Sequence, residues 1–544
     1  MKLNLLKNII LATNVISSYN SSLMKDEKKL DVNFSFEWIN STNQDYLTKI
    51  QNIEKFVSKF NHKNKSYFVS EYTNFIFLKF KDINIYEKEK ILKEIKTYFN
   101  VNNVYSNHYK DNSFKKNKSS VNNFVIDNKN SNTFNVMNFN YEERQKILSI
   151  LENKKNMGKR IKVGVLDDGK IEKKSEYFSD EKDIHLIDNK ERFWWFNNNY
   201  GDHATKVASV IGGKNGINPY THLYGIRSFS YNGSSHEIEW LMKNGVKVIN
   251  LSYYLSNESE YNWASKYLDS LSQNTKNEVT FFIASGNLED KKYSDVYKKG
   301  LLGDGLSYNS IVVGAIRNND FLEEFSSWRS KTGKKINVVA PDDFSDSDNK
   351  YLNGTSFSAP AVAGIVSVLM EIEKDIYAKG LDSIITMSAL TASSNYNIWT
   401  KNENNLYELS KKVVHDYYGP GKIDFMKMRE ALQNIEYKIL NNGNTSDDVS
   451  FKKIYLKKGE KISVGLAWNY NLKNKKNGNP HVHDFDLKII GPNNFEKSSQ
   501  MTDNNYERVV FEVPESGEYN FKVKPYESLL HSDEFHVALS FVKF

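Results

Sequence analysis

Residues 161–167 read Ile-Lys-Val-Gly-Val-Leu-Asp, a short apolar run that ends in a carboxylate. Similar runs with many β-branched side chains follow, and helix-like stretches fall between some of them. The runs lie at 246–251, 279–283, 311–313 and 336–339, and the helix-like stretches at 236–243 and 261–271. Strands that are apolar throughout are typical of a parallel sheet covered on both faces. We therefore predict an α/β fold with a doubly wound parallel sheet over residues 142–440, which binds ligands beyond the carboxyl ends of its strands.

Two further domains are predicted to flank this sheet. Residues 30–110 contain strand and helix patterns in the order βαββαβ, that of a small ferredoxin-like domain, although a generic α+β module fits the same order. Residues 111–141 are rich in Asn, Ser and Lys and poor in large aliphatic side chains, which predicts an exposed linker that is easily cut. Residues 446–544 combine short strands with turns, which favours an antiparallel β-sandwich.

Charge and composition exclude several classes of function. The net charge of +7 comes from 74 basic and 67 acidic residues, with no dense basic block of the kind that follows a phosphate backbone. Nucleic-acid binding is therefore not expected. The chain has no cysteine, which excludes disulfides, thiolate zinc sites and a cysteine nucleophile.

The N-terminal residues 1–22 hold a short apolar run behind Lys2 and Lys7. The run is too short for a membrane span, which needs about 20 apolar residues, and it favours an export signal or an anchor. We expect a secreted or cell-surface protein, in contact with a membrane only through this segment. The alternative is an ordinary amphipathic helix.

Ser356 occupies a position suited to a nucleophile. It lies in residues 353–360, Asn-Gly-Thr-Ser-Phe-Ser-Ala-Pro, immediately before the apolar helical stretch 361–373. Unpaired N–H groups at a helix start can stabilise an oxyanion, and the proline suits a first helical turn. A serine in this position also fits a helix N-cap.

Three other polar residues complete a catalytic set. Asp167 ends the first apolar run, His203 stands ahead of small residues that begin a helix, and Asn287 follows the run 279–283. A buried carboxylate can orient an imidazole, the imidazole can take the serine proton, and an amide N–H can bind an oxyanion. Each residue alone also fits a turn, a surface histidine or a loop. Together, in this order around one sheet, they favour acyl transfer.

The four segments around these residues resemble the motifs of the subtilases, the subtilisin-like serine proteases of peptidase family S8. The motifs are Val-Gly-Val-Leu-Asp-Asp-Gly, Asp-His-Ala-Thr-Lys-Val-Ala, Ala-Ser-Gly-Asn and Gly-Thr-Ser-Phe-Ser-Ala-Pro. The resemblance implies that Asp167, His203 and Ser356 form the triad and that Asn287 is the oxyanion donor. It also implies an inhibitory prodomain at 30–110 and the β-sandwich found in some large bacterial subtilases. The high content of Asn, Lys and Ile favours a small AT-rich bacterial genome of the mycoplasma type.

Substrate binding is expected to differ from the family pattern. The resemblance places Ser252, Tyr253 and Tyr254 on the substrate-binding strand, with Gly286 opposite. Tyr254 stands where the family commonly has glycine, and its bulk is expected to reshape or partly fill the pocket. Lys206 departs from the His-Gly-Thr-His pattern without removing a triad member.

The predicted function is that of a serine endopeptidase acting on extracellular or host proteins. The expected partners are a protein or peptide substrate and the chain's own prodomain. A catalytically silent scaffold that binds proteins at the cell surface is the alternative. No cofactor is expected for the chemistry. Asp484 and Asp486 are weak candidates for structural calcium, and they also fit turn or strand-start carboxylates.

Overall fold

The structure is a computed structural model. It describes residues 29–39, 44–62, 65–109, 131–154, 160–167, 169–187, 201–227, 234–256, 258–275, 278–287, 300–330, 332–345, 351–401, 406–410, 412–441, 448–472, 475–476, 479–480, 482–525 and 534–544. The chain divides into two compact units, Met1–Lys118 and Ser119–Phe544, and each is described by itself. The predicted export signal at 1–22 lies outside the described residues, as does the predicted linker at 111–130.

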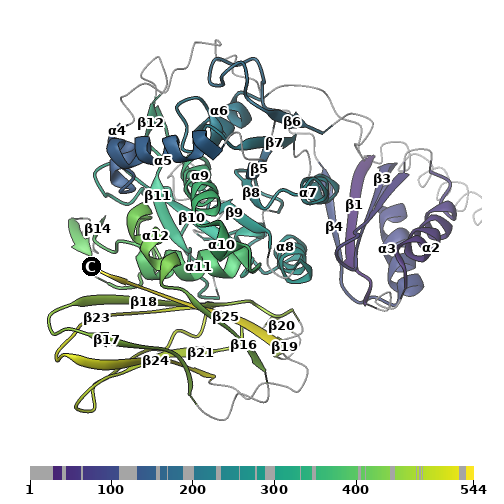
Figure 1. Ribbon diagram of the computed structural model, residues 1–544. Helices are drawn as coiled ribbons and strands as arrows, with labels where there is room; N and C mark the ends of the chain where they lie inside the picture. The colour runs from purple at the N-terminus through teal and green to yellow at the C-terminus, as the bar shows by residue number, and fades with distance from the viewer. Residues whose placement is uncertain are drawn as a thin grey trace, which may run out of the picture. The chain divides into compact units, whose positions relative to one another are not determined.

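The described residues of the first unit form an antiparallel sheet with two helices. Its elements are β1 (Leu30–Glu37), α2 (Tyr46–Ser58), β2 (Lys65–Val69), β3 (Phe75–Ile83), α3 (Ile85–Phe99) and β4 (Val104–Tyr109). The strand order across the described part of this sheet is β2-β3-β1-β4, and Figure 1 shows β3, β1 and β4 side by side. Asn84 and Glu87 form a reciprocal cap at the start of α3, which satisfies two backbone N–H groups and fixes where the helix begins.

A parallel sheet forms the centre of the second unit, and this part of the predicted fold is confirmed. Its strands are β5 (Lys162–Asp167), β6 (Ile184–Leu186), β7 (His222–Arg227), β8 (Val248–Leu251), β9 (Thr280–Ala284), β10 (Ile311–Ile316) and β11 (Val338–Pro341). Among the described residues the strand order is β11-β10-β9-β8-β5-β7-β6. The order therefore reverses at β5, where the carboxyl ends of neighbouring strands open a crevice.

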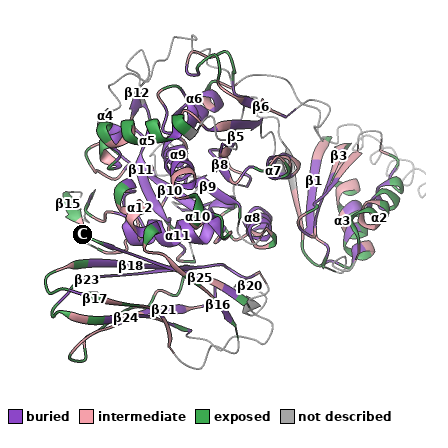
Figure 2. Cartoon of the chain, viewed as in Figure 1, coloured by how far each residue is buried: buried purple, intermediate pink, exposed green. Residues whose placement is uncertain are grey.

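The helices of this unit include a long apolar one that crosses the sheet. They are α4 (Ser131–Val136), α5 (Tyr141–Lys154), α6 (Asp202–Gly212), α7 (Ser234–Lys243), α8 (Trp263–Asn274), α9 (Thr355–Ile372), α10 (Lys374–Tyr377), α11 (Asp382–Ser393), α12 (Phe425–Gln433) and a short 3-10 helix, η5 (Gly303–Leu306). Within the described chain α9 alone is long and apolar enough to span a membrane, and 83% of it is buried inside the protein. It packs along β8 to β11 and against α6, as a core helix does (Figure 2).

The predicted C-terminal boundary of the linker, at residue 141, is wrong. Residues 131–141 contain α4 and the start of α5. Phe134, Met137 and Phe139 are buried in the same core as the parallel sheet, and the Phe139 ring lies 4.4 Å from that of Phe425. Burial of these three apolar side chains holds the segment to the body of the unit.

The last part of the chain forms two antiparallel four-stranded sheets. The described strands run in the orders β16-β25-β18-β23 and β17-β24-β21-β22. The bounds are β16 (Glu436–Asn441), β17 (Val449–Leu456), β18 (Lys461–Trp468), β21 (Phe485–Ile490), β22 (Glu496–Ser499), β23 (Tyr506–Glu512), β24 (Gly517–Pro525) and β25 (Glu534–Lys543). A shared apolar core lies between them. β16 pairs with β25, so this sandwich includes residues before the predicted boundary at 446.

Three short strand pairs complete the second unit. They are β12 (Phe344–Ser345) with β13 (Tyr351–Leu352), β14 (Ile398–Lys401) with β15 (Tyr407–Ser410), and β19 (Lys475–Lys476) with β20 (Asn479–Pro480).

A buried arginine joins the sandwich to the body of the unit. Arg508 on β23 is only 3% exposed, and burial lowers its pKa to about 9. Its guanidinium donates to the carbonyls of Ser394 at 2.6 Å and Ala392 at 3.3 Å, at the end of α11, and also to the Pro420 carbonyl. The carbonyls that end a helix lack partners of their own, so this side chain satisfies groups that would otherwise be buried without a donor.

Candidate active site

The predicted catalytic residues lie at one edge of the parallel sheet. Asp167 is the last residue of β5, Ser252 follows β8 and Asn287 follows β9 shortly after its end. Because β5, β8 and β9 are parallel neighbours, their carboxyl ends meet at the same edge, next to the reversal of strand order at β5.

Asp167 and His203 form a close pair. The Asp167 Oδ1 atom lies 2.8 Å from His203 Nδ1. The Asp167 side chain is 1% exposed and that of His203 is 38% exposed, so the imidazole has its carboxylate partner in the interior and part of its ring open to solvent. The His203 ring centroid lies 5.6 Å from that of Phe357, the residue after Ser356. A histidine held in this way can accept a proton from a neighbouring hydroxyl.

Ser356 is not a helix cap. α9 begins at Thr355 and its N-cap is Gly354, with φ 124° and no side-chain cap. Ser356 therefore lies inside the first turn, where backbone N–H groups have no partner within the helix. The predicted place of Pro360 in the first turn is also wrong, because the helix starts earlier and the proline lies inside it.

The carbonyl of Ser356 receives a hydrogen bond from another element. Pro360 has no N–H group, so it cannot make the usual helix bond to the residue four positions before it. The Ser252 hydroxyl donates to the Ser356 carbonyl instead, at 2.8 Å, and Asn250 Nδ2 donates to Ser252 Oγ at 2.9 Å. Ser252, predicted to bind substrate, thus also holds the first turn of α9 against β8.

Asn287 is oriented by Thr355. Its Oδ1 atom accepts from the backbone nitrogen of Thr355 at 3.0 Å and from the Thr355 hydroxyl at 2.9 Å. A backbone N–H can only donate, so the amide oxygen faces Thr355 and the Nδ2 group is left to donate elsewhere. The Gly286 N–H in turn donates to Thr355 Oγ1 at 3.1 Å. Thr355, which the sequence analysis gave no role, fixes the amide that we expect to bind the oxyanion.

A cavity opens beside Ser356. Its volume is about 190 Å³, and it is lined by Ser252, Tyr253, Tyr254, Ala284, Gly286, Asn287, Thr355 and Ser356. The Tyr254 hydroxyl donates to the Ser285 carbonyl at 3.1 Å. Burial, with a smaller effect of Asp304, raises the pKa of Tyr254, so the phenol stays neutral. A Cβ atom on Gly286 would lie 1.6 Å from this hydroxyl, so Tyr254 packs directly on the Gly286 backbone.

A buried acidic side chain, which no local sequence pattern marks, supports the segment before Ser356. Asp342 follows β11 and is fully buried, and its Oδ2 atom accepts from the Gly354 N–H at 2.7 Å. Burial raises its pKa to about 8. This bond holds the residue at which the chain turns into α9.

Lys206 forms an ion pair within its own helix. Its Nζ atom lies 2.8 Å from Asp202 Oδ2, one helical turn earlier on α6. The departure from the family motif therefore leaves the catalytic pair in place.

Two groups of three side chains within the described residues could hold a metal ion. They are Asp183, His185 and His222, and Glu323, Asp342 and Asp343. The calcium candidates Asp484 and Asp486 belong to neither group. Asp486 is buried on β21, and burial raises its pKa.

A carboxylate-held histidine, a serine at a helix start and an oriented amide at one sheet edge are the kinds of group that a serine peptidase site contains. Residues 158–421 match the model of the Subtilase family of peptidases, which supports a subtilase.

The sequence is similar to several known proteases. It is 26% identical over 204 residues to alkaline serine exoprotease A of Vibrio alginolyticus, which covers 35% of this chain and 35% of that protein. It is 25% identical over 239 residues to subtilisin DY of Bacillus licheniformis, covering 39% of this chain and 77% of that protein. The solved structure of the prenylagaramide maturation protease PagA is similar, with a TM-score of 0.39 and 21% identity, and covers 53% of this chain and 98% of its own. The chain thus spans about a third of the length of the Vibrio relative.

Proposed function

We propose that the protein is a serine endopeptidase that cleaves protein or peptide substrates through an acyl-enzyme. The observation that carries the proposal is the 2.8 Å contact of buried Asp167 with His203 beside the start of α9. A histidine anchored by a buried carboxylate, with its ring against the residue that follows a serine, supports nucleophilic catalysis by that serine.

Each residue has a defined step in this reaction. Ser356 Oγ attacks the substrate carbonyl carbon and transfers its proton to His203 Nε2, while Asp167 stabilises the imidazolium. The tetrahedral oxyanion accepts hydrogen bonds from Asn287 Nδ2 and the Ser356 N–H. His203 then gives its proton to the leaving amine as the carbon–nitrogen bond breaks. A water molecule, deprotonated by His203, releases the acyl group by the same route.

The cavity beside Ser356 is proposed to bind the substrate side chain that precedes the cleaved bond. Tyr254 packs against Gly286 and forms part of its wall. The phenol takes up room that a smaller residue would leave open, so we propose that the pocket accepts small or medium-sized side chains.

The first unit is proposed to be a prodomain that is removed by cleavage between residues 111 and 130. The proposal rests on the βαββαβ order of its elements. Mass spectrometry of fully active, mature protein tests it, and an intact N-terminal segment in that material would contradict it. Secretion or display at the cell surface of a bacterium is proposed separately, from the short apolar run behind Lys2 and Lys7 in residues 1–22.

Digestion of a denatured protein and peptide library tests the peptidase function. We expect cleavage by the parent protein and none by its Ser356→Ala variant. A folded parent protein that cleaves no member of the library would instead favour a silent scaffold that binds proteins.

A further inference from the structure

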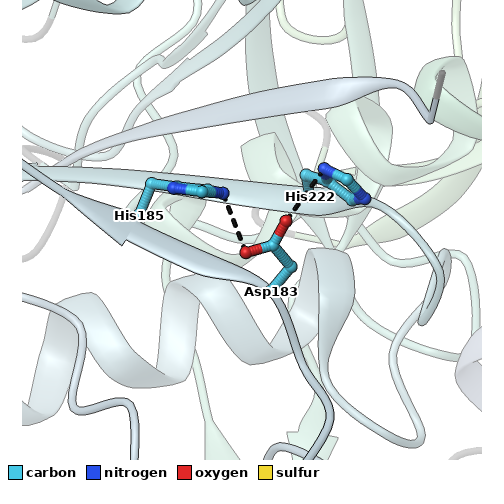
Figure 3. Close-up of side chains that lie close together, drawn as sticks. All are labelled: Asp183, His185 and His222. Atoms are coloured by element: carbon cyan, nitrogen blue, oxygen red, sulfur yellow. Dashed lines mark ion pairs between the residues drawn. The ribbon is translucent and has the colours of Figure 1, made fainter.

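Asp183, His185 and His222 gather at the opposite end of the parallel strands from the candidate active site. Asp183 immediately precedes β6, His185 lies on it, and His222 is the first residue of β7. The cluster is therefore at the amino ends of these strands, whereas Asp167 ends the neighbouring strand β5. Figure 3 shows the Asp183 carboxylate between the two imidazole rings.

The contacts within the cluster are short. Asp183 Oδ1 lies 2.8 Å from His185 Nε2, and Asp183 Oδ2 lies 3.0 Å from His222 Nδ1. One ligand atom from each of the three residues lies within 4.8 Å of the others. Ligand atoms at about 2.0–2.2 Å from one zinc ion are spaced on this scale.

The backbone under the cluster is fixed. Ile184 pairs with Leu223 in the parallel ladder, and the Leu223 N–H donates to the Asp183 carbonyl at 3.0 Å. Alternate residues of a strand share a face, which puts Asp183 and His185 on the same side. The His185 ring also stacks on Tyr224, with centroids 4.4 Å apart and planes 18° apart. Side-chain rotations alone are needed to bring the three groups onto one ion.

The donor set and its exposure suit a zinc-type ion. Two imidazoles and one carboxylate are a common set of three protein ligands for zinc, with a water molecule in the fourth position. The side chains of Asp183, His185 and His222 are 44%, 43% and 33% exposed, so an ion and its water can enter. Both histidines can present the required nitrogen by moving a proton to the other ring nitrogen.

Two nearby lysines do not occupy the site. Lys162 donates to the Asn244 carbonyl at 2.7 Å. Lys182 donates to the Pro219 carbonyl at 2.8 Å and also to that of Thr221. Their ammonium groups are held by the backbone and leave the carboxylate to the histidines.

We propose that Asp183, His185 and His222 form a binding site for one divalent zinc-type ion, separate from the catalytic residues. The ion would link β6, a three-residue strand at the edge of the sheet, to β7. This proposal does not depend on the peptidase function.

Cobalt titration of the full chain tests the site, in the Ser356→Ala variant after treatment with a chelator. We expect one Co²⁺ per chain with visible bands of tetrahedral coordination, and displacement of the Co²⁺ by Zn²⁺. His185→Ala and His222→Ala should each weaken binding by more than about tenfold. His62→Ala, which removes a histidine of the first unit that contacts Glu87 and Phe80, and His203→Ala should leave binding unchanged.

Two outcomes would overturn the proposal. One is the absence of saturable binding, and the other is binding that survives His185→Ala and His222→Ala or is lost in His203→Ala. If a variant fails to fold, X-ray absorption of the zinc-loaded Ser356→Ala protein tests the site without a ligand substitution. It should show two imidazole ligands at about 2.0–2.1 Å, and a spectrum without imidazole scattering would refute the site.

Discussion

We propose that Asn287 uses the oxygen and the nitrogen of its side-chain amide for two different tasks, which substitutions can remove separately. The Oδ1 atom accepts hydrogen bonds from Thr355 at 3.0 and 2.9 Å. Those bonds exist before substrate binds, so they contribute to folding and to the position of the loop. The Nδ2 group is expected to act on the oxyanion, which forms only in the transition state.

Asn287→Ala removes both tasks. The loss of one oxyanion donor from a serine peptidase lowers kcat by about 10²–10³, or about 2.7–4 kcal/mol. The loss of the two bonds to Thr355 should lower the free energy of unfolding by about 1–2 kcal/mol. This cost is small for two hydrogen bonds because Asn287 is exposed and water can replace the acceptor.

Asn287→Asp is the matched control. A carboxylate keeps both acceptor bonds to Thr355 and replaces the N–H donor by a negatively charged oxygen. We expect the free energy of unfolding to stay within about 0.5 kcal/mol of the parent value. The fall in kcat should equal or exceed that of the alanine variant, since the new charge repels the oxyanion.

Initial rates on a fluorogenic peptide chosen from the library give kcat and KM for the three proteins. Urea unfolding in the Ser356→Ala background gives their stabilities without self-digestion. The account expects KM to be nearly unchanged, because the donor acts only in the transition state. A fall in kcat of less than about tenfold in both variants, or an effect confined to KM, would refute the role of Nδ2.

Three further predictions concern the pocket, the sandwich and a buried acid. Tyr254→Ala should enlarge the cavity and extend cleavage to bonds that follow larger side chains. Mass spectrometry of the cleavage products measures this preference, and an unchanged preference would contradict the proposed pocket. Arg508→Met leaves carbonyls at the end of α11 without donors, so it should lower the free energy of unfolding, measured with urea, by about 3–5 kcal/mol. A loss below about 1 kcal/mol would argue against Arg508 as the residue that joins the sandwich to the body of the unit. The pKa of Asp342 is about 8 in the folded protein, against 3.8 when unperturbed, so its contribution to stability is complete below pH 3.8 and is lost as pH rises towards 8. Asp342→Asn keeps an acceptor for the Gly354 N–H. It should remove the fall of about 1.4 kcal/mol per pH unit that Asp342 causes in the free energy of unfolding as pH rises. If the free energy of unfolding of the variant falls between pH 5 and 8 as steeply as that of the parent protein, the raised pKa is contradicted.

The centre of the sheet was predictable because its strands are buried on both faces. β9 and β10 are buried along their whole length, and such strands appear in the sequence as uninterrupted apolar runs. β6 and β7 were missed because polar residues such as His185 and His222 interrupt their apolar pattern. β6 is short and lies at the edge of the sheet, with β7 next to it.

The start of α9 was misplaced because tertiary contacts determine it. The polar residues before Ala361 and the proline at 360 suggest a late start. In the fold, the Ser252 hydroxyl takes the place of the missing Pro360 N–H. That contact joins residues 104 positions apart, and no local pattern encodes it.

The candidate catalytic residues could be proposed from the sequence as a set, but the contacts that support them could not. Asp167, His203, Asn287 and Ser356 stand in short segments with a recognisable order. Thr355 and Asn287 are 68 positions apart, so the contact that orients the amide appears only once the sheet brings β9 and α9 together.

Labelling with a fluorophosphonate is the most direct test of the central claim that Ser356 is the nucleophile. The folded protein should gain a single adduct, and peptide mass spectrometry should place it on Ser356. Ser356→Ala should not be labelled, and His203→Ala should be labelled far more slowly because the proton acceptor is missing. Labelling that persists in Ser356→Ala, or a folded parent protein that gains no adduct, would contradict the account.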